Sequence, residues 1–427
     1  MIASNTSSIP IASIARACQR RDRIAGMHFF NPVPLMGLVE VIRAAETTDA
    51  TVEALTVLGR RMGRTPVTVK DSPGFLVNMG GRAYTTEGLR IAHEGVATPA
   101  QIDAIMRDCW HFRMGPFELM DLTGIDVNFP VSRIIYDGYM QDPRIKTSPN
   151  HMAMFDAGLY GRKVGKGWYE YEDGQPKPRP SPDFETDAAA LKKIAVLGFT
   201  EERGTAGSSE FDVPFDGQDW ELDPDEFADF EDDPELRVQR HMQLLLFRFC
   251  GELGLEVLGE DDGESPILCV PVGPDMSSVG RYHSDYRRVV GIDLAGDTSK
   301  RVTLMTAPGS DPDVLARVAA TIIASGRKVT AIKDSPGFVG QRMVAMIANL
   351  GCYMAEIGLA APRDIDLAMQ LGLNYPHGPM ELVEELGIDA TFQVLEMLQR
   401  ITGEERYRPT LWLKRRAELG LSIYTEN

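Results

Sequence analysis

Two residues near the start of the chain have the side chains and the setting for proton transfer. His28 follows the aliphatic run Ile24–Met27, and Glu40 lies within a second apolar run, Leu38–Ile42. Both runs are expected to be strands, and the turn that Asn31-Pro32 predicts between them would fold the strands together. An imidazole that titrates near neutral pH is a competent general base, and a carboxylate on its other nitrogen fixes the tautomer. The pattern therefore predicts a histidine–carboxylate pair.

A short polar run upstream of His28 favours chemistry over simple packing. A histidine followed by Phe29 and Phe30 is, taken alone, more often a packed core residue than a catalytic one. Ser4-Asn5-Thr6-Ser7-Ser8, however, follows a short apolar start, and α/β sheets place ligands at such points. We therefore interpret His28 and Glu40 as candidate site residues.

The elements that must position this pair occur twice in the chain. Lys70-Asp71-Ser72-Pro73-Gly74-Phe75 recurs at an offset of 263 residues as Lys333-Asp334-Ser335-Pro336-Gly337-Phe338. Gly115-Pro116 and Gly124-Ile125-Asp126 recur at the same offset, without a gap. Each copy shows a short helix and a β-branched strand before Asp-Ser-Pro-Gly, then a long helix (75–92; 338–356) and further helices. The sequence predicts two copies of one domain, each with an α/β front and a helical back.

The order and spacing of these motifs resemble one enzyme family. The motifs are Ser-Asn-Thr-Ser-Ser, His-Phe-Phe-Asn-Pro-Val-Pro, Leu-Val-Glu-Val-Ile, Asp-Ser-Pro-Gly-Phe-Leu-Val-Asn, Met114–Leu119 and the glycine-rich ending Gly161–Tyr169. Together they resemble the 3-hydroxyacyl-CoA dehydrogenases over residues 1–171. The second copy and the overall length resemble the tandem members of that family, including those of phenylacetate degradation.

The resemblance implies a role for each matching residue. His28 would take the proton of the substrate's 3-hydroxyl while hydride leaves for NAD, and Glu40 would orient His28. Ser7 and Asn78 would hydrogen-bond the acyl-CoA substrate, and Ser7 and Asn31 would lie near the nicotinamide. The family usually has arginine after the substrate-binding asparagine, whereas this chain has Met79, which weakens one anchoring interaction.

The front of the chain departs further from the family. A dinucleotide site needs a strand, a glycine-rich turn and a helix N-terminus for the pyrophosphate, and no Gly-x-Gly-x-x-Gly occurs in this sequence. We expect the chain to lack most of the N-terminal NAD-binding domain. It would be a fragment of a longer enzyme or a member that has lost NAD binding, and the intact residues of the first copy favour the fragment.

The second copy has changed at each of the matching positions. Asp293 falls where His28 falls, Thr303 where Glu40 falls, and Gln341 where Asn78 falls. We expect this copy to be structural. The helical domains would pair within the chain as a pseudo-twofold dimer, or else between chains as a homodimer.

Composition and charge exclude several other classes of protein. The chain has 427 residues and a net charge of −18, and thirteen acids without a Lys or Arg lie between Glu210 and Glu235. We interpret this stretch as a solvated linker, with a docking site for a basic partner as the alternative. Nucleic-acid binding is disfavoured because it needs a basic face, and no apolar run could span a membrane. Scattered cysteines argue against a metal site and favour a reducing cytoplasm.

The predicted fold class is an α/β remnant of a Rossmann-type sheet followed by an all-helical domain like that of 6-phosphogluconate dehydrogenase, duplicated, with a degenerate second copy. The expected segments are 1–70 (the end of the NAD-binding domain), 71–171 (helical), 172–264 (acidic linker, irregular), 265–333 (second Rossmann-like remnant) and 334–427 (second helical domain). The predicted function is NAD-dependent oxidation of 3-hydroxyacyl-CoA in fatty-acid or aromatic-acid degradation. The alternative is a non-catalytic acyl-CoA-binding or dimerisation scaffold.

Overall fold

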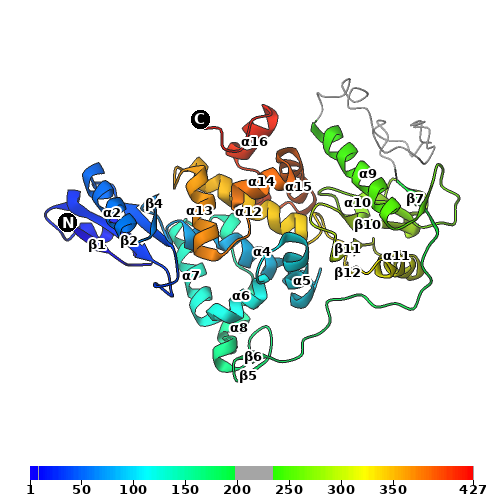
Figure 1. Ribbon diagram of the computed structural model, residues 1–427, viewed down its shortest axis with the longest axis horizontal. Helices are drawn as coiled ribbons and strands as arrows, with labels where there is room; N and C mark the ends of the chain where they lie inside the picture. The colour runs from blue at the N-terminus through cyan, green and yellow to red at the C-terminus, as the bar shows by residue number, and fades with distance from the viewer. Residues whose placement is uncertain (8, 198–233, 427) are drawn as a thin grey trace.

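The molecule has two α/β lobes at opposite ends of a helical body (Figure 1). This arrangement is taken from a computed structural model, which describes residues 1–7, 9–197 and 234–426. The N-terminal sheet lies at one end, the second sheet lies at the other, and helices from both halves of the sequence fill the space between them. Below, "first half" means residues 1–171 and "second half" means the described residues from 193 onward.

The first sheet has four strands in the order β1-β2-β3-β4. They are β1 (Ile2–Ser4), β2 (Ile24–Phe29), β3 (Leu38–Arg43) and β4 (Thr65–Lys70), and only β2 and β3 run antiparallel. The helix α2 (Asp49–Arg61) packs on this sheet through a stripe of buried side chains. The strand β1 lies at the edge of the sheet, and its residue Ile2 is 58% exposed. The predicted strands around His28 and Glu40 are thus confirmed.

The helical part of the first half begins two residues after Phe75. A single helix was expected over 75–92, but the structure has α3 (Val77–Gly80) and α4 (Arg82–His93), separated at Gly81. The segment continues through α5 (Pro99–Trp110), α6 (Pro116–Thr123), α7 (Ile125–Gly138), η2 (Pro143–Ile145) and α8 (Pro149–Asp156). The turn η3 (Arg162–Val164) and the hairpin β5–β6 (Tyr171–Glu172, Gln175–Pro176) end it.

The second sheet has six strands in the order β12-β11-β10-β9-β7-β8. They are β7 (Lys193–Val196), β8 (Glu256–Leu258), β9 (Ile267–Cys269), β10 (Val289–Asp293), β11 (Arg301–Met305) and β12 (Lys328–Ile332). The prediction that 172–264 is irregular was therefore wrong, because β7, α9 (Pro234–Glu252) and β8 form a parallel β-α-β unit of this sheet. The strands β7 and β8 have only four and three residues, so the acidic composition of this segment predicted irregular structure instead. That stretch, with its predicted linker or docking role, lies outside the described residues up to position 233.

The remaining elements complete the second half. The short helix α10 (Met276–Gly280) follows β9, and α11 (Pro312–Ala324) packs on the second sheet. The helical part then consists of α12 (Gly340–Glu356), α13 (Pro362–Leu373), α14 (Pro379–Leu386), α15 (Ile388–Thr402), η6 (Glu405–Tyr407) and α16 (Leu411–Glu418). The helices α13, α14 and α15 begin 263 residues after α5, α6 and α7.

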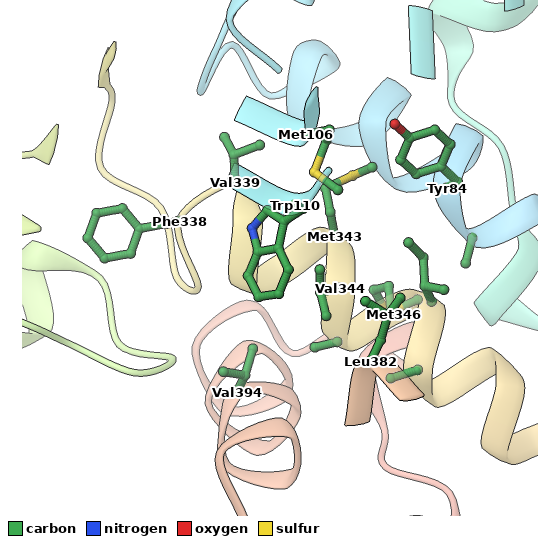
Figure 2. Close-up of a cluster of buried hydrophobic side chains, with 14 of the residues drawn as sticks. Tyr84, Met106, Trp110, Phe338, Val339, Met343, Val344, Met346, Leu382 and Val394 are labelled. Atoms are coloured by element: carbon green, nitrogen blue, oxygen red, sulfur yellow. The ribbon is translucent and has the colours of Figure 1, made fainter. Parts of the chain in front are cut away.

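The two halves pack against each other through reciprocal contacts. The backbone N–H of Lys70 donates to the carbonyl of Leu359 at 2.9 Å, and that of Lys333 donates to the carbonyl of Val96 at 3.0 Å. Each donor and each acceptor lies 263 residues from its counterpart, so the contacts are related by a local twofold axis. Helices α4 and α12 lie side by side at this interface. Figure 2 shows first-half side chains such as Tyr84 and Met106 in one core with second-half side chains such as Met343 and Leu382.

Neither a membrane span nor a metal cluster occurs in the part of the chain that the structure describes. No helix there is long and apolar enough to cross a bilayer. No group of three or more His, Cys, Asp or Glu side chains there could hold a metal ion. The cytoplasmic location stays a prediction.

Candidate active site

His28 and Glu40 face each other across two antiparallel strands. They are direct partners in the register of β2 and β3, so their side chains project from the same face of the sheet. The distance from His28 Nδ1 to Glu40 Oε2 is 2.6 Å, and both side chains are buried. Because a carboxylate can only accept a hydrogen bond, Nδ1 carries the proton and Nε2 is left with a free lone pair. This is the tautomer that a general base requires.

The second oxygen of Glu40 is held by the backbone at the start of α3. Glu40 Oε1 accepts hydrogen bonds from the N–H groups of Leu76 at 3.0 Å and Val77 at 2.8 Å. These donors are available because Gly74 and Phe75 adopt left-handed conformations, with φ of 75° and 51°, which turn the chain from β4 into the helix. Glu40 is therefore fixed from both sides, and so is the plane of the imidazole that it contacts.

The free nitrogen of His28 faces the polar loop after β1. Its Nε2 lies 3.1 Å from Ser7 Oγ, and the Ser7 side chain is exposed. Asn5 Oδ1 accepts from the N–H of Phe29 at 3.0 Å and ties this loop to the end of β2. Asn78 Nδ2 donates to the carbonyl of Ser7 at 3.4 Å. The structure thus brings four of the five predicted site residues into one connected group.

Asn31 is the predicted site residue that stays outside this group. It is exposed in the turn after β2, and within the described ranges no hydrogen bond joins it to His28 or Ser7. The rings beside the imidazole are Phe30, with a centroid distance of 4.5 Å, and Phe75, at 5.8 Å. One side of the site is therefore apolar, and the loop containing Ser7 is its polar side.

A residue of the second half packs against the backbone segment that holds Glu40, and the sequence did not predict this contact. Gly372 of α13 lies so close to the first sheet that a Cβ atom there would come within 3.0 Å of Val77 and 3.1 Å of Leu38. Val77 is one of the two residues whose N–H groups hold Glu40. A glycine near the end of a helix gave no signal of this, because only the packing of the two halves brings it next to the site.

The corresponding place in the second half is closed. Asp293 pairs with Thr303 in the register of β10 and β11, as His28 pairs with Glu40. Gln341 Nε2 donates to Asp293 Oδ1 at 3.0 Å, and Gln341 Oε1 accepts from the N–H of Gly273 at 3.0 Å. Burial raises the pKa of Asp293 to about 6, although the Gln341 amide favours the charged form.

A tryptophan of the first half covers this second place. The indole of Trp110, at the end of α5, lies against Gly296 and Gly340, where added Cβ atoms would meet it at 3.0 and 2.4 Å. Figure 2 shows Trp110 beside Val339 and Met343 of the second half. Trp110 is 1% exposed, Asp293 is buried as well, and both lie against Gly340.

Comparison with known proteins agrees with this geometry. Residues 1–72 match the domain family described as "3-hydroxyacyl-CoA dehydrogenase, NAD binding domain", and residues 74–171 and 337–423 both match "3-hydroxyacyl-CoA dehydrogenase, C-terminal domain". The chain is 33% identical to 3-hydroxyadipyl-CoA dehydrogenase of Escherichia coli K12 over 98% of this chain and 75% of that protein. It is 41% identical to human mitochondrial hydroxyacyl-coenzyme A dehydrogenase over 40% of this chain and 55% of that protein.

A solved structure extends the similarity to the arrangement of the whole chain. The crystal structure of a 3-hydroxybutyryl-CoA dehydrogenase from Escherichia coli K12 superposes with a TM-score of 0.74 at 31% identity, over 98% of this chain and 75% of that one. The domains and the relatives are those of NAD-dependent oxidoreductases. The chain belongs to the 3-hydroxyacyl-CoA dehydrogenase family.

One expectation about the front of the chain is corrected by these matches. The sequence was expected to lack most of the NAD-binding domain, but residues 1–72 match that domain, which is therefore present. The expectation relied on the glycine-rich loop as the mark of the domain, whereas the matched residues contain β1 to β4 and the motifs around His28 and Glu40. The match says nothing about the glycine-rich loop, and the effect of the missing Gly-x-Gly-x-x-Gly motif on cofactor binding stays a prediction.

Proposed function

We propose that this chain oxidises the 3-hydroxyl group of 3-hydroxyacyl-CoA thioesters, with His28 as the general base and Glu40 as its orienting partner. The observation that carries the proposal is the hydrogen bond of 2.6 Å between His28 Nδ1 and Glu40 Oε2, with Nε2 directed at the polar loop. A substrate hydroxyl near Ser7 Oγ would give its proton to Nε2. Glu40 would then stabilise the imidazolium that forms.

The remaining predicted residues would position the reactants. Ser7 Oγ lies 3.1 Å from His28 Nε2, and the Asn78 amide is joined to the same loop through the carbonyl of Ser7, so both would hydrogen-bond the oxygens of the substrate. The rings of Phe30 and Phe75 would keep water away from one side of the imidazole. The names of the relatives, 3-hydroxyadipyl-CoA and 3-hydroxybutyryl-CoA dehydrogenase, support a dicarboxylic or short 3-hydroxyacyl group as the substrate.

The residues present fit one end of NAD. Ser7, in the loop after β1, and Asn31, in the turn after β2, are both exposed, and a nicotinamide ring held between them would reach the carbon that carries the hydroxyl. When bound, NAD supplies the hydride acceptor for that carbon. The chain contains no Gly-x-Gly-x-x-Gly turn to hold the pyrophosphate, so we assign to it only the nicotinamide end of the site.

We infer that the second half is a degenerate duplicate that supports the first. The shared domain match, the constant offset of the helices and the reciprocal hydrogen bonds support a duplication. Asp293 cannot replace His28, since Gln341 occupies one carboxylate oxygen and Trp110 covers the site. The place of Gly372 behind Val77 supports a buttressing role in the active site.

The proposal is tested by NADH oxidation with acetoacetyl-CoA, the reverse of the proposed reaction. Because the chain has no glycine-rich turn for the pyrophosphate, we expect turnover by the wild-type chain at high NADH concentration. The control variant Asp293→Asn, which alters only the second half, should have the same turnover. Binding of acetoacetyl-CoA in calorimetry without any NADH oxidation would instead support the non-catalytic scaffold. Loss of turnover in Asp293→Asn, with its thermal midpoint unchanged, would contradict the assignment of a structural second half.

A further inference from the structure

The interface between the halves contains a buried ion cluster on one side of the local twofold axis. Glu87 of α4, which is completely buried, accepts from Arg342 Nε at 2.6 Å and from the Tyr407 hydroxyl at 2.9 Å. Arg406 Nη2 lies 2.8 Å from the other oxygen of Glu87, and Arg342 Nη1 lies 2.8 Å from Glu94. The carboxylates come from the first half, and the guanidinium groups come from the second.

The mirror positions across the axis lack these charges. At the offset of 263 residues, Arg342 corresponds to Met79, Glu87 to Leu350, and Glu94 to Ile357. Met79 and Leu350 are buried in the apolar core that the halves share. Met79 belongs to α3, which packs against α12 and α13 of the second half, so the departure from the family's arginine falls in an element of the interface between the halves.

The remaining cation of the cluster is present on both sides but has different partners. Arg406 in η6 corresponds to Arg144 in η2 by its place as the second residue of the 3-10 turn, at an offset of 262 residues. The ion pair that the described residues show for Arg144 is with Asp142 of its own half at 3.1 Å, while its guanidinium lies over the ring of Tyr353. At the exposed rim, Arg90 bridges Glu94 and Glu404.

We propose that this one-sided cluster makes the two halves selective for each other and disfavours pairing of either half with its own kind. A second half paired with another second half would set Arg342 and Arg406 against Leu350, leaving two buried cations without a carboxylate on each side. A first half paired with another first half would set Glu87 against Met79. The only cation left facing Glu87 would then be Arg144 of the other copy. A buried ion that loses its partner is left as an uncompensated charge, which is strongly destabilising. The unpaired charges therefore disfavour both kinds of like pair.

The charge state of Glu87 agrees with this role. Burial alone would raise its pKa, but the guanidinium groups of Arg406 and Arg342 outweigh burial and hold the pKa below its usual range. Glu87 is therefore ionised at neutral pH, and its removal from these cations in a mispaired complex would leave a buried charge. The partner that fits this surface of the first half is the second half of the same chain, and a second copy of the first half is disfavoured.

The experiment cuts the folded chain and lets the halves choose their partners. A protease site inserted at Gly174, in the exposed turn of the β5–β6 hairpin, separates residues 1–174 from the rest after folding. The cut protein is unfolded in urea, refolded, and analysed by native mass spectrometry. We expect complexes of one first half with one second half, with like pairs roughly 100-fold less abundant.

A matched pair of variants shows whether charge sets this choice. Met79→Arg with Leu350→Glu gives both halves both charges, and we expect like pairs to increase at least tenfold (about 1.4 kcal/mol). The control, Met79→Leu with Leu350→Met, changes the same two positions without charge and should keep the wild-type choice. Equal amounts of like pairs in the wild type and in the charged variant would overturn the proposal.

A measurement on the uncut chain covers the case in which the cut halves do not refold. Arg342→Met should lower the apparent thermal midpoint by roughly 5 °C or more, because it leaves Glu87 and Glu94 without their shared cation. Met79→Leu, at the mirror position, should shift the midpoint by less than about 2 °C. Equal shifts in the two variants would show that the cluster does not hold the halves together and would reject the proposal.

Discussion

Replacing Glu40 with glutamine should invert the tautomer of His28 while preserving the shape of the site. Glu40 Oε1 faces two backbone donors, the N–H groups of Leu76 and Val77, so the single oxygen of glutamine must stay there. The amide nitrogen then faces His28 Nδ1 at the position of the present 2.6 Å contact. Because an amide nitrogen only donates, Nδ1 must become the acceptor and the proton must move to Nε2.

A protonated Nε2 cannot accept the proton of the substrate hydroxyl. The loss should therefore equal the contribution of a positioned general base, about 10²–10⁴-fold in kcat. At 1.36 kcal/mol for each factor of ten, this corresponds to about 3–5 kcal/mol of transition-state stabilisation. The assay is NADH oxidation with saturating acetoacetyl-CoA, and ¹⁵N chemical shifts of the imidazole report the tautomer independently of turnover. A variant whose kcat falls less than about threefold, with Nε2 visibly protonated, would refute the reasoning.

Two further predictions concern the second half. Gly372→Val should lower kcat by roughly 10–100-fold, because the new side chain would displace Val77, whose N–H holds Glu40. The control is Gly259→Val, at a position where an added side chain meets no other atom. Equal kcat values in the two variants would contradict the buttressing role. Asp293, with its pKa raised to about 6 by burial, binds its proton more tightly in the folded state than its ordinary pKa of about 3.8 would allow. Stability should therefore fall by roughly 3 kcal/mol as pH rises from about 4 to about 6. Asp293→Asn should remove that part of the fall in urea unfolding, and an identical pH profile in both proteins would contradict it.

The residues at the reaction centre could be anticipated from the sequence because they depend on local order. His28 follows one apolar run and Glu40 lies within the next, with a proline turn between them, so a hairpin-like pairing places them opposite each other. The polar run Ser4–Ser8 was anticipated because it follows a short apolar start, and the role of Ser7 within that run is what the family resemblance implies. These relations require only strand periodicity and one turn, which the sequence encodes over short distances.

The parts that escaped prediction depend on contacts between distant segments. The N–H groups that hold Glu40 become available only once Phe75 adopts a left-handed conformation, which its residue type does not signal. Gly372 and Trp110 reach the two sites only because the halves pack around a local twofold axis. The parallel pairing of β7 with β8 was not anticipated, because strands of three and four residues carry little periodicity. The position of Met79 likewise gave no signal, because its counterpart Arg342 binds Glu87 only across the interface between the halves.

The most direct test of the central claim is the turnover of His28→Gln relative to the wild type. Glutamine at this position keeps a polar side chain of similar size but has no group that titrates near neutral pH. NADH oxidation with acetoacetyl-CoA is measured for both proteins after their thermal midpoints have been shown to agree. We predict that kcat falls by about 10²–10⁴-fold in the variant. Undiminished turnover in a folded His28→Gln protein would remove the histidine–carboxylate pair from the mechanism.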